Sequence, residues 1–139
     1  LDLEPVMGRF EAGVLIEGRI RAHNPRLHIT EVDAQGVMLT LPLLERMAPG
    51  ESLRLRIRAR DVAIATRQPE YLSIRNVLPG VLVSITEEPG SGSAEANVDV
   101  NGMHIRARLT LAAVEALALT PGMPVYALVK SVSFEPFGG

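Results

Sequence analysis

This sequence of 139 residues contains no cysteine and no tryptophan, and aromatic residues make up only 4% of it. Without cysteine there is no disulfide framework, no thiolate metal site and no cysteine nucleophile. So few aromatic side chains leave little surface on which nucleic-acid bases could stack. The formal net charge of −2 also lacks the basic excess of a nucleic-acid-binding protein. We therefore expect no nucleic-acid partner.

Long hydrophobic runs are missing too. No stretch approaches the roughly 18 consecutive apolar residues of a membrane-spanning helix, and no basic segment followed by an apolar one marks a signal peptide. Hydrophobic residues make up 47% and charged residues 22%, which is typical of a folded globular protein. We expect no direct membrane insertion. Because the chain begins with Leu1 rather than methionine, we also expect it to be a piece of a longer protein.

Catalytic motifs are absent as well. The sequence has no Walker-type phosphate loop, no Gly-x-Ser-x-Gly elbow and no His-Glu-x-x-His zinc helix. The histidines His23, His28 and His104 are scattered, and they are predicted to be solvated strand residues rather than a metal site. The acidic pair at 87–88 precedes a loop of glycine and serine and is predicted to be solvated, not an acid/base dyad. We expect no enzyme activity, metal or cofactor in this chain.

What is present is a series of short strand patterns. Residues 53–58 alternate between apolar and basic side chains, which is the period of a half-buried strand. Residues 95–100 alternate between apolar side chains and acidic or amide ones, and 103–109 resume the alternation beyond Asn101-Gly102. That dipeptide predicts a tight hairpin, because both central positions of a type I′ turn need positive φ.

Helical patterns are confined to two segments. Residues 111–119 predict a helix, with Thr110 as its N-cap and Pro121-Gly122 beyond its end. A shorter counterpart is predicted from Pro42 to Pro49-Gly50.

These endings belong to an internal repeat. Pro49-Gly50 and Pro121-Gly122 stand 72 positions apart (121 minus 49), and each is followed by a strand pattern. Earlier in each half, Gly18 aligns with Gly80, which stands 62 positions further on (80 minus 18). The fold predicted is mostly β: tandem OB-like barrel modules over 1–66 and 67–139, each with one short helix and with the junction near 67–70. Such small modules are expected to pack together to bury a core.

One group of polar residues could bind an anion. Residues at the first strand of the second module can meet those at its last strand, because these strands can be neighbours in a barrel. Arginine, lysine, hydroxyl and amide side chains there supply many donors, which suits a tetrahedral dianion. A hydroxyl residue before the helix adds free backbone N–H groups. The alternative is that the two cations are solvated charges at strand ends. The candidates are Ser73, Arg75, Asn76, Thr110, Lys130 and Ser131.

The stretch Ser-Ile-Arg-Asn-Val-Leu-Pro-Gly at 73–80, with Lys-Ser at 130–131, resembles the Ser-x-Arg-Asn…Lys-Ser pattern of molybdate-binding Mop modules, the molbindins. The run from 55 to 80 is similar to the C-terminal region, of Mop/TOBE type, of molybdate transporter ATP-binding subunits. The resemblance covers nearly the whole chain. It implies tandem OB-like barrels that pair across two subunits and bind molybdate or tungstate at module interfaces.

Carried over residue by residue, the resemblance assigns the oxyanion to Ser73, Arg75, Asn76, Lys130 and Ser131. Thr110 matches more loosely, and Ala113 stands where the family pattern has a hydroxyl, which shifts helix-side contacts to backbone N–H groups.

The first module departs from this pattern. Glu11 and Gly13 align with Ser73 and Arg75, and Ala59 lacks the hydroxyl of Ser131. We expect no complete anion site there. Arginines 54, 56 and 58 on one strand face are read as a solvated or interface face rather than as anion ligands.

The resemblance implies a non-enzymatic function, the sensing of intracellular molybdate or tungstate to regulate a transporter. The implied partners are a second copy of the chain, an upstream ATPase domain of the same polypeptide and, through it, a membrane permease. The implied location is the cytoplasmic side of the inner (cell) membrane, peripheral to it. Two other functions remain open: an independent molbindin-type storage protein, and a structural dimerisation module without a ligand.

Overall fold

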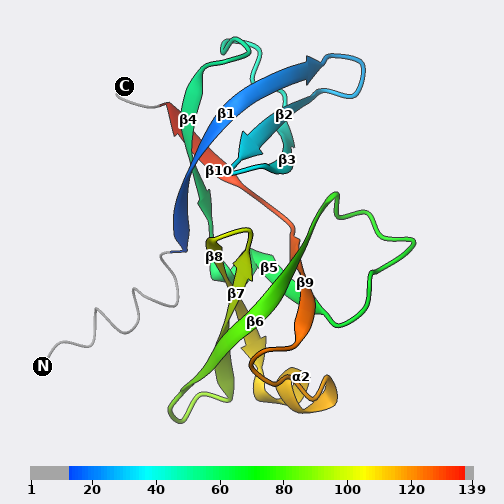
Figure 1. Cartoon of the computed structure of the whole chain (residues 1–139), viewed down its shortest axis with the longest axis vertical. Coiled ribbons are helices and arrows are strands. Elements are labelled where there is room, and N and C mark those ends of the chain that lie inside the picture. The colour runs from blue at the N-terminus through cyan, green and yellow to red at the C-terminus, as the bar shows by residue number, and fades with distance from the viewer. Residues whose placement is uncertain (1–12, 137–139) are drawn as a thin grey trace, which may run out of the picture.

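The computed structural model describes residues 13–136 and is built almost entirely of β-strands. The strands form two antiparallel sheets of five strands each, one above the other along the long axis of the molecule (Figure 1). The predicted mostly β class is confirmed, and the described part contains one short α-helix.

The first sheet has the strand order β10-β4-β1-β2-β3. Its long central strand is β1, which bends at a bulge between Ile20 and Ala22. The strands are β1 (Val14–Asn24), β2 (Ile29–Ala34), β3 (Val37–Pro42), β4 (Ser52–Ile57) and β10 (Ser133–Pro136).

The second sheet has the order β5-β9-β6-β7-β8. At its edges β8 contacts β5 and the short 3-10 turn η1, so this sheet curls toward a barrel. Its elements are η1 (Ala59–Asp61), β5 (Val62–Ala65), β6 (Asn76–Glu88), β7 (Ser93–Val100), β8 (Met103–Thr110), the helix α2 (Leu111–Ala116) and β9 (Pro124–Val129).

The two sheets exchange strands at their ends. β5 precedes residue 67 but pairs with β9, and β10 from the end of the chain pairs with β4. Each half of the sequence therefore supplies one strand to the other half's sheet. Whether 1–66 and 67–139 are separate folding modules stays a prediction.

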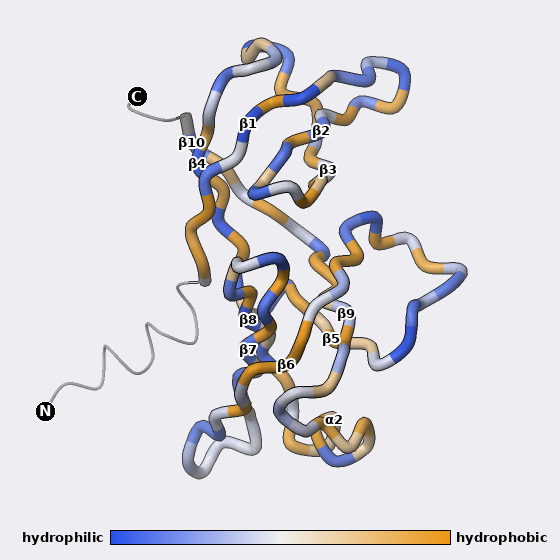
Figure 2. The backbone as a smooth tube through the Cα atoms, viewed as in Figure 1, coloured by the Kyte–Doolittle hydropathy of each residue, from blue (hydrophilic) through white to orange (hydrophobic). Residues whose placement is uncertain are grey.

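The core is one continuous cluster of apolar side chains that spans both sheets. It follows from the alternation along the strands: Leu53, Leu55 and Ile57 are fully buried, while the arginines between them are only partly covered. Figure 2 shows this alternation as changes of colour along the strands. The expectation that two small modules pack together is met by this shared cluster.

The internal repeat is visible in the hydrogen bonds. The N–H of Gly50 donates to the carbonyl of Ile20 at 2.8 Å, and the N–H of Gly122 donates to that of Leu82 at 2.7 Å. The bulges of β1 and β6 begin at the same two residues, Ile20 and Leu82. The Pro-Gly pairs thus place equivalent strands in both sheets.

The predicted hairpin at Asn101-Gly102 is confirmed, with φ of 51° and 91°. The first sheet has an equivalent turn at Gln35-Gly36, with φ of 53° and 83°. The side-chain amide of Asn101 donates to the carbonyl of Gln35, so the two hairpin tips touch.

The helix after Thr110 is confirmed, although it ends at Ala116 and the chain turns away at Ala118, whose φ is 50°. The helix predicted between Pro42 and Pro49 is wrong, because the described residues there form turns. Contacts from β1 and β2 hold this segment as turns: the ring of His23 bonds to the carbonyl of Met47 at 2.7 Å, and the hydroxyl oxygen of Thr30 accepts from the N–H of Leu44 at 2.8 Å.

Two glycines are required by close approach rather than by positive φ. A Cβ at Gly80 would lie 2.6 Å from the backbone oxygen of Asp99, whereas at Gly18 it would meet only side-chain atoms of Val32 and Leu55, at 2.6 and 2.9 Å. Gly80→Ala should lower the free energy of unfolding by about 1–3 kcal/mol. Gly18→Ala should cost less, because side chains yield more readily than backbone. Urea denaturation of both variants checks the order, and equal losses would contradict it.

Candidate functional site

A pocket of about 370 Å³ lies where the first sheet meets the second. One wall comes from the first sheet, at the start of β2 and the end of β3. The other comes from the second sheet, at the start of β6 and the end of β9. The residues that line it are His28, Ile29, Thr40, Leu41, Pro42, Ser73, Ile74, Arg75, Asn76, Val129 and Lys130.

The structure brings four of the predicted site residues to this pocket: Ser73, Arg75, Asn76 and Lys130. These residues meet because β6 and β9 are neighbouring strands, as expected, with Asn76 of β6 paired with Val129 of β9. Ser73, Arg75 and Lys130 are exposed, so their polar groups can reach a ligand from solvent.

The backbone positions the two cations. The guanidinium of Arg75 donates to the carbonyl of Leu72 within the same loop. The backbone N–H of Lys130 donates to the carbonyl of Asp61 at 2.8 Å, which fixes the end of β9 against η1. Ser131 follows directly and is exposed, but it is not among the lining residues.

Asn76 differs from the other three because it is buried. Its side-chain oxygen accepts from the N–H of Thr40 at 2.7 Å, and its amide nitrogen donates to the carbonyl of Thr40 at 2.9 Å. Thr40 lies on β3, an edge strand of the first sheet. Asn76 therefore joins the two walls of the pocket, and one of its two amide N–H donors is left for a ligand.

Thr110 does not line the pocket. Its hydroxyl oxygen accepts from the N–H of Ala113 at 3.0 Å and caps α2. In Figure 1, α2 lies at the lower end of the second sheet, whereas β6 begins at the upper end, beside the first sheet. Within one chain, Thr110 and the Ser73–Lys130 group are thus separate.

The charged side chains that line the pocket are positive. Among the described residues that line it, Arg75 and Lys130 are charged and none is acidic. Three other pockets each contain a carboxylate; the adjacent one, of about 300 Å³, combines Arg60, Arg108 and Lys130 with Asp61. The chemistry of the first pocket therefore favours an anion most clearly.

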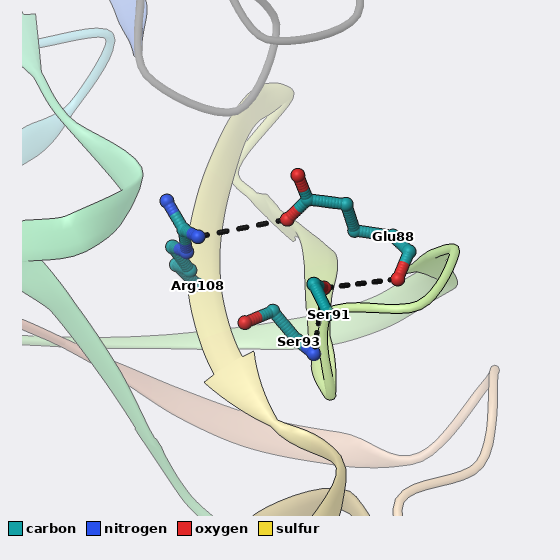
Figure 3. Close-up of polar contacts among 4 residues, drawn as sticks. All are labelled: Glu88, Ser91, Ser93 and Arg108. Carbon is teal, nitrogen blue, oxygen red and sulfur yellow. Dashed lines mark hydrogen bonds and ion pairs between the residues drawn. The ribbon is translucent and has the colours of Figure 1, made fainter.

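Arg108 of the adjacent pocket already has an anionic partner. Its guanidinium lies 3.5 Å from a carboxylate oxygen of Glu88 (Figure 3). Ser91 donates to the carbonyl of Glu88 at 2.9 Å and orders the start of the loop. The prediction of a solvated acidic pair holds for Glu87, which is exposed, but is wrong for Glu88, which is half buried because β8 brings Arg108 beside it.

The three histidines have different surroundings. The ring of His23 bonds to the hydroxyl of Thr30 at 2.8 Å and to the carbonyl of Met47, so the prediction of a solvated strand residue is wrong there. His104 lies 3.1 Å from the amide oxygen of Asn97. His28 lines the pocket. No group of potential metal ligands is found among residues 13–136.

The aligned position in the first module has no room for a side chain. A Cβ at Gly13 would lie 2.4 Å from the carbonyl oxygen of Ile57. A residue equivalent to Arg75 is therefore sterically excluded there. Glu11, the other aligned position, lies outside the described residues. The sequence also predicted a strand face lined with arginines. One of them, Arg54 on β4, has its guanidinium 3.2 Å from a carboxylate oxygen of Glu135 on β10.

The sequence did not predict the wall of the pocket that the first sheet provides. Thr40 contributes through its backbone, which leaves no signal in the sequence, and His28 stands 45 positions before Ser73 (73 minus 28). No local pattern links such distant segments.

The chain is similar to several known proteins. Residues 72–134 match the TOBE domain family. The chain is 44% identical over 128 residues to the molybdenum import ATP-binding protein ModC of Rhizobium meliloti (strain 1021), covering 92% of this chain and 35% of that protein. Identity to the protein of the same name from Mesorhizobium japonicum is 40% over 136 residues, covering 97% and 36%. The chain thus spans about a third of the length of these relatives.

A solved structure is also similar. The cytoplasmic molybdate-binding protein ModG, with molybdate bound, superposes with a TM-score of 0.72 at 26% identity, covering 88% of this chain and 95% of that one. No helix among residues 13–136 has the length and apolar character needed to cross a membrane.

Proposed function

Because residues 72–134 match the TOBE domain family and nearly the whole chain is similar to part of the molybdenum import ATP-binding proteins, we propose that it binds molybdate or tungstate and regulates a transporter. The observation that carries the proposal is the pocket at the junction of the sheets. It gathers Arg75, Lys130 and Ser73 with no acidic residue among its described lining.

The donors fit a tetrahedral dianion. Arginine and lysine donate only, the serine hydroxyls add neutral donors, and Asn76 adds its second amide N–H. Each oxygen of the anion accepts several hydrogen bonds, so a site rich in donors can satisfy all four. In this proposal the ligands are Ser73, Arg75, Asn76, Lys130 and Ser131, with Thr110 from a second copy.

A second copy of the chain completes the site in this proposal. Thr110 does not line this pocket of its own chain, so in this proposal it reaches the anion from a neighbouring molecule. Apart from Thr40, which Asn76 binds, the edge strand β3 also leaves backbone groups that a partner can cover. The proposed assembly is a homodimer related by a two-fold axis.

The proposed setting is an ATP-binding subunit on the cytoplasmic face of the cell membrane, where an ATPase domain of the same polypeptide contacts a permease. This part then has no catalytic role. An anion bound between two copies stabilises one arrangement of the paired domains, to the extent that it binds that arrangement more tightly. High internal molybdate would thereby slow further import.

The similarity to the molybdate-binding protein ModG favours a second candidate, free-standing storage of the same anion. It requires the same pocket but no attached ATPase. A structural dimerisation module is the third possibility, and it differs because it binds no anion.

Isothermal titration calorimetry tests the proposal. We expect molybdate and tungstate to bind with similar affinity, because they have nearly the same size and charge, and sulfate and phosphate to bind more weakly. Phosphate near neutral pH carries a proton that needs an acceptor, and the cations of the pocket are donors only. Sulfate binding as tight as molybdate binding would overturn the selectivity, and heat from none of the four anions would favour the structural module.

A further inference from the structure

His28 stands out among the three histidines because its ring has no hydrogen-bond partner within residues 13–136, whereas those of His23 and His104 do. It is also the one histidine of the three that lines the pocket of Arg75 and Lys130. The first sheet thus contributes an uncommitted donor to a pocket whose charged residues all come from beyond residue 72.

The backbone of His28 is held from both sides. Its N–H donates to the carbonyl of Pro25 at 3.2 Å, and its carbonyl accepts from the N–H of Leu43 at 3.0 Å. The two hydrogen bonds between the Asn76 side chain and the backbone of Thr40 hold the same sheet against β6. The position of His28 relative to the second sheet is therefore fixed by contacts that do not involve its ring.

The backbone conformation of His28 does not depend on its ring. Its φ of 56° lies in the left-handed region, which glycine adopts at no steric cost. The turn itself therefore does not require the imidazole.

We infer that His28 is a further oxyanion-binding residue, whose imidazole N–H donates to the anion from the first sheet. Imidazole supplies such a donor in either tautomer. The anion then touches both sheets: Arg75 and Lys130 on one side and His28 on the other. The inference rests on the proposed function, since it concerns the same pocket and the same tetrahedral dianions.

The test is a molybdate titration of His28→Gly. Glycine relieves the positive φ while it removes the ring, so the variant should unfold at the same urea concentration as the parent or at a higher one. Its affinity for molybdate should nevertheless fall about 10-fold, the lower end of the effect of one hydrogen bond to a charged group. His28→Asn tolerates the same φ and keeps an amide donor, and it should lose less. His104→Ala, which removes an exposed histidine elsewhere, should bind like the parent.

Nuclear magnetic resonance of the histidine rings in the parent adds a direct measurement. Molybdate should shift the ring signals of His28 and leave those of His104 in place. If molybdate binds the parent and Arg75→Ala weakens that binding, but His28→Gly binds like the parent and the His28 signals do not move, the inference is wrong and the proposed function stands. If the parent binds no molybdate, both are wrong.

Discussion

Arg75→Ala and Lys130→Ala should each weaken molybdate binding about 10- to 150-fold, because a hydrogen bond to a charged group contributes roughly 1.5–3 kcal/mol. Both side chains are exposed, and the backbone contact of Lys130 to Asp61 does not depend on its side chain. The barrel should therefore keep its stability. Calorimetry and urea denaturation of each variant measure the two quantities separately.

Two controls sharpen this result. Arg67→Ala removes the same charge from an exposed residue of the same loop outside the pocket, and it should leave affinity nearly unchanged. Arg75→Lys keeps the charge but loses the planar fork, so it should lie between parent and alanine variant. If Arg60→Ala weakens binding and Arg75→Ala does not, the anion occupies the adjacent pocket, and the site assignment is wrong.

The strands were predictable because their signal is local. Residues 53–58 and 95–100 alternate with a period of two, and burial follows that alternation in the structure. Asn101-Gly102 defined its hairpin because few dipeptides adopt positive φ twice in succession. The repeat was predictable because both Pro-Gly pairs can be read directly from the sequence. In the structure both pairs make the equivalent backbone hydrogen bond.

The features that failed depend on contacts between distant segments. The pattern after Pro42 is compatible with a helix, but His23 and Thr30 bind the backbone of Met47 and Leu44 and hold that segment as turns. The exchange of β5 and β10 between the sheets is likewise set by pairing across the whole chain.

The candidate site was half predictable. Ser73, Arg75, Asn76 and Lys130 meet because β6 and β9, the first and last strands predicted for the second module, are neighbours. The opposite wall could not be predicted, because nothing in the sequence of β3 shows that the backbone of Thr40 receives Asn76.

Mixing two variants that each bind molybdate weakly should restore parental affinity at some of the sites if the site is shared between two copies. Thr110→Asp keeps the helix cap, because aspartate also accepts from the helix N–H groups, but it places a carboxylate against the anion. Repulsion between that carboxylate and a dianion should weaken binding about 10-fold or more. Arg75→Ala damages the other half of the same site.

In a mixed dimer of Thr110→Asp and Arg75→Ala chains, one site carries both substitutions and the other carries neither. After unfolding and refolding an equal mixture, about a quarter of all sites should therefore bind with parental affinity, because half of the dimers are mixed. The refolded Thr110→Asp protein alone and the refolded Arg75→Ala protein alone are the controls, and neither should recover. A site contained within one chain predicts no recovery in the mixture either, because every chain then carries a damaged site. Sedimentation of the parent as a 15.0 kDa monomer, with and without molybdate, would contradict the shared site independently.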